Sequence, residues 1–146
     1  MFRFRLQQVL DLRASQERDL ATQLAAALGA EHTAKEQLDG LRAERDAGAE
    51  RAQDGRAHSV GELTNLAFIM QQLDDQIIDA HSIVSAANSS VSQVKEALTA
   101  AFRDRRVLDR LRERHEETYR VVAENADRRT MDDIALSRFV HNDNSQ

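Results

Sequence analysis

The sequence of 146 residues has no proline, no cysteine and no tryptophan, and it contains only five glycines. The lack of cysteine excludes disulfide bonds and thiolate metal sites. The glycines all precede residue 62, so nothing from there to residue 146 is expected to break a helix. No stretch approaches the roughly 18 apolar residues of a membrane-spanning helix. Long, water-exposed helices remain as the fold class to test.

Motifs of catalytic and metal sites are also missing. The sequence lacks G-x-x-x-x-G-K-[ST], H-E-x-x-H and G-x-S-x-G, and its five histidines are too widely spaced for a local metal pair. The adjacent acids at 74–75 and 132–133 would point in different directions on a helix, which favours solvated faces over paired catalytic carboxylates. A net charge of -5 argues against nucleic acid as a partner. We expect no enzymatic activity, no metal and no cofactor.

What the sequence does contain is a helical repeat. Charged residues make up 31% and aromatic residues 4%, which suits solvated helices with a narrow apolar seam. Alternating steps of three and four residues from Leu6 meet mostly apolar residues as far as Ala52, as a coiled-coil heptad requires. The same steps from Leu63 to Ala101 meet apolar residues only. Beyond Ala101, charged residues recur in the frame.

Two helices joined by a turn follow from this repeat. Glycines cluster near the break between the two runs, and Ser59 precedes Glu62 by three residues, which is the spacing of a capping box. We predict an all-α fold, an antiparallel two-helix coiled-coil hairpin with an overhanging C-terminal helix, forming a single domain over 1–146. The expected bounds are a helix at about 3–54, a turn at about 55–60, a second helix at about 61–140 and a disordered tail at 141–146.

The position of the turn predicts the register. A turn near residue 57 sets residue i of the first helix opposite roughly residue 115 minus i of the second, so that Leu38 faces Ile77. The first helix, about 75 Å long at 1.5 Å per residue, then ends opposite about position 110, where the second seam turns polar. A rival pairing, with i opposite 146 minus i, sets Arg13 beside Asp133. It requires a turn at about 73–76, away from every glycine, and it stays open as the alternative.

Arginines at positions 3, 5 and 13 lie at the start of the first helix, where acidic side chains would suit the helix dipole better. The stretch lacks the apolar run of a secretory signal and has too many acids for a transit peptide, so we expect it in the mature protein. A second group of arginines lies in FRDRRVLDRLRER, at 102–114, where the first helix should end. The two groups predict a positive collar for an acidic partner; the alternative is a solvated face with ion pairs along the helix.

Short pieces at both ends of the chain resemble the flagellar export protein family FliJ. F-x-F-x-L-Q-x-V-L occupies residues 2–10, and A-E-N followed by M-D-D-I-A lies near the C-terminus. The resemblance runs nearly end to end, and the glycine-bearing first helix departs from the family's usual pattern. It implies an antiparallel coiled coil, similar to the central stalk of rotary ATPases, that sits in the hexameric export ATPase of the flagellar type III secretion system. It also implies contact with the export gate, a membrane protein.

The resemblance implies a cytoplasmic protein at the inner face of the cell membrane, at the flagellar base, with export chaperones as further partners. We expect the collar and the overhanging helix to bind the export ATPase, through Phe2, Arg3, Phe4, Arg5, Arg110, Arg112, Arg114, Tyr119, Val122, Arg128 and Arg129. For Phe2 and Phe4, packing against Leu108 and Leu111 is an open alternative. The resemblance places the expected gate-binding residues in the middle of the second helix; they are Ile69, Gln72, Leu73, Gln76 and Ala80.

A function of a different class also fits the pattern. A general cytoplasmic coiled-coil chaperone or scaffold would hold helical partners on exposed seam residues. A peripheral membrane rod is disfavoured, because the chain is acidic and no segment has a lysine-rich face opposite Trp or Phe.

Overall fold

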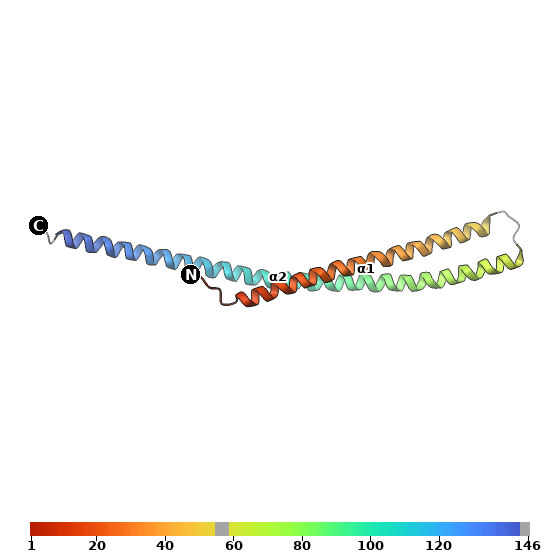
Figure 1. The fold of residues 1–146 in the computed structure, drawn as a ribbon, viewed down its shortest axis with the longest axis horizontal. Coiled ribbons are helices and arrows are strands. Elements are labelled where there is room, and N and C mark those ends of the chain that lie inside the picture. Colours follow the sequence, from red (N-terminus) through yellow and green to blue (C-terminus); the bar gives the residue numbers. More distant parts are fainter. Residues whose placement is uncertain (55–58, 144–146) are drawn as a thin grey trace. The chain divides into compact units, whose positions relative to one another are not determined.

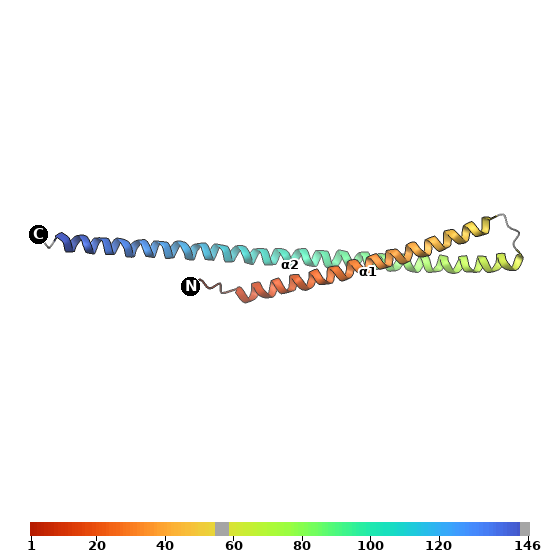
Figure 2. The ribbon, with the colours of Figure 1, turned by 45° about the horizontal axis from the view of Figure 1, so that its top comes forward.

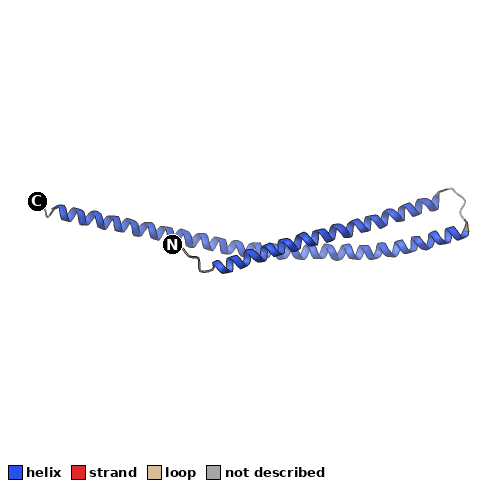
Figure 3. Ribbon diagram, viewed as in Figure 1, coloured by secondary structure: helices blue, strands red, loops and turns tan. Residues whose placement is uncertain are grey.

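The computed structural model describes residues 1–54 and 59–143. Nearly all of them lie in two α-helices, α1 (Gln7–Gln53) and α2 (Val60–Asp143) (Figures 1 and 3). The described ranges contain no strand. The chain divides into two compact units, one of residues 1–16 with 101–146 and one of residues 17–100. Within each unit part of α1 packs against part of α2, which confirms the all-α, two-helix prediction.

The helix ends differ a little from the predicted bounds. α1 begins at Gln7, whereas a start at about residue 3 was expected, because Gln7 N donates a hydrogen bond of 3.1 Å to Phe4 O and closes a turn before the helix. α2 ends at Asp143, whereas an end at about residue 140 was expected. The predicted turn and tail fall partly at 55–58 and 144–146, outside the described residues.

A capping box starts α2, as the sequence predicts. Glu62 N donates to Ser59 Oγ at 3.2 Å, and Ser59 N donates to a carboxylate oxygen of Glu62 at 3.3 Å. These two bonds satisfy backbone N–H groups that have no partner inside the helix. The start of α2 is therefore fixed by the local sequence.

The heptad seam forms the helix contact in the unit of residues 17–100. Every seam residue from Glu17 to Gly48 and from Leu66 to Leu98 is buried or half-buried, and most residues on the other faces are exposed. The most buried apolar side chains of this unit are Ala34, Leu38, Leu73, Ala80 and Val91. The core of this unit is thus a single narrow seam, as the composition predicts.

The observed register differs from the predicted one by three residues. A Cβ placed on Gly48 would lie 2.7 Å from Met70 Sδ, so residue i faces residue 118 minus i rather than 115 minus i. An ion pair between Arg45 and Asp74 agrees with this offset. In the observed register every seam residue of α1 faces a seam residue of α2, whereas the predicted register brings only alternate seam residues together.

The rival pairing is wrong. It requires Arg13 to lie beside Asp133, but in the unit of residues 1–16 and 101–146 Arg13 Nη1 lies 3.7 Å from a carboxylate oxygen of Asp104. The pair Arg13–Asp104 fits the observed offset to within one residue. Both units therefore show the same antiparallel register.

The C-terminal part of α2 has no helix beside it in its unit, as predicted for an overhang. Leu111 is the last half-buried residue, and every described residue from Arg112 to Asp143 is exposed. This section, which we call the overhang, is the blue-cyan end of α2 in Figure 2. Neither helix has a stretch, among the described residues, that is long and apolar enough to cross a membrane.

Candidate functional site

The first six residues form a non-helical segment that runs along α2 in their own unit; we call it the N-terminal segment. The Phe2 ring lies 5.8 Å from the Tyr119 ring, and the Phe4 ring lies 5.8 Å from the His115 ring in an edge contact. The amine of Met1 donates a hydrogen bond of 3.0 Å to the Tyr119 hydroxyl. The segment therefore covers part of the overhang that α1 does not reach.

This geometry favours the packing alternative for the two phenylalanines, but with other partners than expected. Phe4 is only 8% exposed and Phe2 is half-buried, so both offer little surface to another protein while the segment is in place. Their ring partners, His115 and Tyr119, lie one to two helical turns beyond the expected Leu111. The alternation F-x-F was the sequence signal for this packing, since it puts both phenylalanine rings on one side of an extended chain.

The arginine collar is made of the arginines in residues 1–16 and 101–114. These stretches contain nine arginines and four acidic residues, a formal side-chain charge of +5 on a chain whose total is -5. Positive charge is thus concentrated in one unit, at the start of the overhang. The exposed members are Arg3, Arg5, Arg103, Arg106, Arg110, Arg112 and Arg114.

Some collar residues have partners in their own unit. Arg105 Nη1 donates a hydrogen bond of 3.0 Å to an Asp109 carboxylate oxygen, four residues on. The Arg105 and Arg106 guanidinium groups also lie 5.7 and 5.9 Å from the Phe102 ring centroid. The solvated-face alternative, with pairs along the helix, therefore describes the first part of the collar well.

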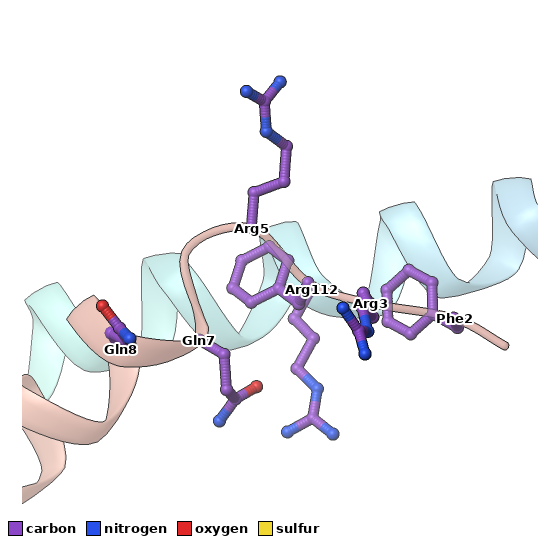
Figure 4. A pocket seen from close by; sticks show the side chains of 7 residues that line it. Phe2, Arg3, Arg5, Gln7, Gln8 and Arg112 are labelled. Atoms are coloured by element: carbon purple, nitrogen blue, oxygen red, sulfur yellow. The ribbon is translucent and has the colours of Figure 1, made fainter.

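A shallow cavity of about 540 Å³ lies beside the N-terminal segment, lined by Phe2, Arg3, Phe4, Arg5, Gln7, Gln8 and Arg112 (Figure 4). The side chains of Arg5 and Arg112 extend in opposite directions in this view. They do not converge on a single point in the cavity. The collar is better suited to a broad acidic surface than to a small anion.

The overhang carries the other expected ATPase-binding residues. Tyr119 is 45% exposed beneath the N-terminal segment, and Val122, Arg128 and Arg129 are exposed. Arg120 donates a hydrogen bond of 2.8 Å to Glu117, which lowers the pKa of Glu117 and raises the pKa of Arg120. The large exposed apolar residues of the overhang are Tyr119, Val121, Val122, Met131, Ile134, Leu136, Phe139 and Val140.

The expected gate-binding residues separate into two groups. Ile69, Gln72 and Gln76 are exposed on α2. Leu73 and Ala80 are less than 10% exposed because they lie in the seam against α1. Only the first group is available to a partner while the helices are paired.

Polar contacts between α1 and α2 flank this part of the seam. Arg45 donates a hydrogen bond to Asp74, and that bond is the main cause of the raised pKa of Arg45. Arg42 and His81 are joined by a contact of 2.7 Å between Nη2 and Nε2. Both contacts join α1 to α2 near the exposed Ile69 surface.

Metal-binding geometry is not found in the part of the chain that the structure describes. No group of three or more His, Cys, Asp or Glu side chains there could hold a metal ion.

A family comparison agrees with this architecture. The model of the flagellar FliJ protein family matches residues 1–144. No curated protein and no solved structure matched the chain. Because the match covers nearly the whole chain, this protein belongs to the flagellar FliJ family and is a component of the flagellar protein export apparatus.

Proposed function

We propose that the protein is a coiled-coil stalk that binds and stimulates the hexameric export ATPase and couples it to the export gate. The observation that carries this proposal is the overhang, where α2 continues beyond Leu111 without a helix beside it. Family membership supplies the export apparatus as the setting. The proposed location is the cytoplasmic face of the cell membrane at the flagellar base.

Apolar side chains on the overhang would supply the binding energy. Tyr119, Val122, Leu136 and Val140 lie in the continued seam and are exposed. Each Å² of apolar surface that a ring subunit covers contributes about 25 cal/mol. A partner helix that packs along this seam would complete the coiled coil that α1 leaves unfinished.

The arginine collar would act mainly on the rate of association. Its exposed guanidinium groups attract an acidic surface at distances of about 10 Å, and added salt screens that attraction. We expect association with the ATPase ring to slow as the salt concentration rises, with a smaller change in the dissociation rate.

Truncation tests the overhang directly. A protein ending at residue 120 keeps the ring contacts of Phe2 and Phe4 with α2, and it should melt almost like the full chain. It should nevertheless lose binding to the purified export ATPase and stimulation of ATP hydrolysis, because most exposed apolar residues of the overhang are gone. Unchanged affinity after this truncation would show that the overhang is not the ATPase contact.

Point variants distinguish a contact through the continued seam from a general effect of added charge. Val122→Asp with Leu136→Asp places charges in the continued seam, and should weaken ring binding strongly. Val121→Asp with Ala135→Asp adds the same charges on another face of the same helix and serves as the matched control. Equal losses in both pairs would indicate a general charge effect rather than a seam contact.

The proposed gate contact is the exposed flank of α2 at Ile69, Gln72 and Gln76. Ile69→Asp should weaken binding to the gate protein and leave helicity by circular dichroism intact, because Ile69 is 44% exposed. Ile78→Asp is the matched control, since Ile78 is also exposed but lies on the opposite flank of α2 from Ile69. Loss of helicity in Ile69→Asp would mean that this residue supports the fold instead.

A chaperone or scaffold function is the second candidate. It is favoured by the apolar residues of the overhang that lie outside the seam, such as Met131 and Phe139. Stimulation of purified export ATPase by the isolated protein separates the two functions. A chaperone would bind unfolded export substrates and leave the hydrolysis rate unchanged.

A further inference from the structure

We propose that the face of α2 around His115 and Tyr119 is a binding site for aromatic side chains, which the N-terminal segment occupies as a displaceable cover in the free protein. The two residues are one helical turn apart, in the same seam as Val122. A partner helix that packs along the seam of the overhang exchanges with the segment at this site.

The spacing of the segment matches the spacing of the site. In an extended chain residues two apart are separated by about 6.6 Å, and on a helix residues four apart rise by about 6 Å. Phe2 and Phe4 therefore meet Tyr119 and His115 one to one, with both ring centroid distances at 5.8 Å. The Met1 amine extends the match with its hydrogen bond to the Tyr119 hydroxyl.

The segment continues into α1 and is held on α2 by a small number of contacts, and its most buried side chain is Phe4, at 8% exposure. Its backbone hydrogen bonds, from Gln7 N to Phe4 O and from Leu10 N to Leu6 O, both lead into α1. On α2 it is held by two ring contacts and the Met1 hydrogen bond, and aromatic ring pairs are individually weak. The cavity of about 540 Å³ beside it, and the 45% exposure of Tyr119, leave room for exchange (Figure 4).

A cover at this place has a clear consequence for the overhang. A partner that reached Val122 and then continued toward the collar would next meet Tyr119, whose ring is already in contact with Phe2. The segment therefore limits how far a partner helix can pair along α2. Removing the cover lengthens the available seam by one to two turns.

The single tyrosine makes the site directly observable, because the chain has no tryptophan and Tyr119 is its only tyrosine. Phe2→Ala with Phe4→Ala should increase acrylamide quenching of tyrosine fluorescence by about twofold, from the 45% exposure of Tyr119 toward full exposure. Arg3→Ala with Arg5→Ala changes the exposed alternate residues of the same segment and should leave quenching unchanged. Equal quenching in the two variants and the native protein would overturn the cover.

A peptide tests the binding site without any export partner. In the variant with Phe2→Ala and Phe4→Ala, a synthetic peptide MFRFRLQQ should protect Tyr119 from quenching in a saturable way. The peptide MARARLQQ keeps both arginines and should give no protection. Equal protection by the two peptides would mean that charge, rather than an aromatic site, holds the segment.

The exchange itself is tested with the export ATPase, and only this part rests on the proposed function. If the cover is closed about nine-tenths of the time, Phe2→Ala with Phe4→Ala should tighten ring binding by up to about tenfold. Weaker binding would mean that the phenylalanines touch the ring and would overturn the exchange. Binding lost in the truncation at residue 120 but unchanged in this variant would overturn the exchange while leaving the stalk proposal intact.

Discussion

Two glycines of α1 give a sharp test of the register. Gly40 has no atom within 4 Å of the position that a Cβ would take, whereas a Cβ on Gly48 would lie 2.7 Å from Met70 Sδ. Glycine in a helix interior costs about 1 kcal/mol relative to alanine. Gly40→Ala should therefore stabilise the protein by about 1 kcal/mol, or about 4 °C in Tm.

Gly48→Ala should behave differently, because Met70 must move. The gain of about 1 kcal/mol in helix propensity is opposed by the cost of moving Met70, which is reduced because Sδ lies near the end of a flexible side chain, so the net stabilisation should lie between about zero and 1 kcal/mol, below that of Gly40→Ala. In a Met70→Ala background the conflict is removed, and Gly48→Ala should then stabilise by about 1 kcal/mol. Urea unfolding followed by circular dichroism measures all three free energies.

Comparing the two alanine variants tests whether Met70 lies against Gly48. If Gly48→Ala stabilises the native protein as much as Gly40→Ala does, Met70 does not lie against Gly48. The observed offset of three residues from the predicted register would then lose its main support, because the ion pairs that agree with it involve long side chains.

Two further predictions concern the unit of residues 1–16 and 101–146. A short bis-maleimide should link Arg13→Cys to Asp104→Cys within one chain and fail to link Arg13→Cys to Asp133→Cys, since the native chain has no cysteine to compete; the reverse pattern would restore the rival pairing. The hydrogen bond from Arg120 lowers the pKa of Glu117, so its contribution to helix stability is present above the ordinary glutamate pKa and is lost as the pH falls through the lowered value. In an Arg120→Gln variant the Glu117 carboxyl signal should titrate at higher pH by NMR; an unchanged titration would mean that the pair does not form in solution.

Helices and seam were predictable because they depend on periodicity alone. Burial follows the stepping of three and four residues closely in the unit of residues 17–100, and the Ser59–Glu62 capping box follows from spacing within one turn of helix. Such local patterns need no knowledge of the opposite helix.

The register was harder to predict because it depends on which seam residues of α1 lie opposite which seam residues of α2. An estimated turn midpoint gives the offset only to within about one helical turn, and the predicted pairs, such as Leu38 with Ile77, were all seam residues. The neighbouring position Leu41 exposes the error, since the predicted register sets it opposite Asp74 rather than a seam residue. Requiring every seam position to match would have selected the observed register.

The partners of Phe2 and Phe4 could not be found by the same means. Residues 1–6 are not helical, so the heptad frame does not say where they run. The predicted register, continued to the N-terminus, sets Phe4 opposite Leu111 and Phe2 opposite Glu113, but an extended chain rises more than twice as far per residue as a helix. The segment therefore reaches His115 and Tyr119 instead.

In an antiparallel register the length of α1 determines how much of α2 remains unpaired. Each residue of α1 is tied to one position on α2, so the number of residues between the turn and Leu10 decides where α2 becomes free. Removing one heptad from α1 alone would release about 10 Å more of α2, whereas removing a heptad from each helix beside the turn would keep the free section unchanged. Changes in chain length near the turn should therefore be tolerated in matched pairs, and unmatched changes should alter how far the overhang extends.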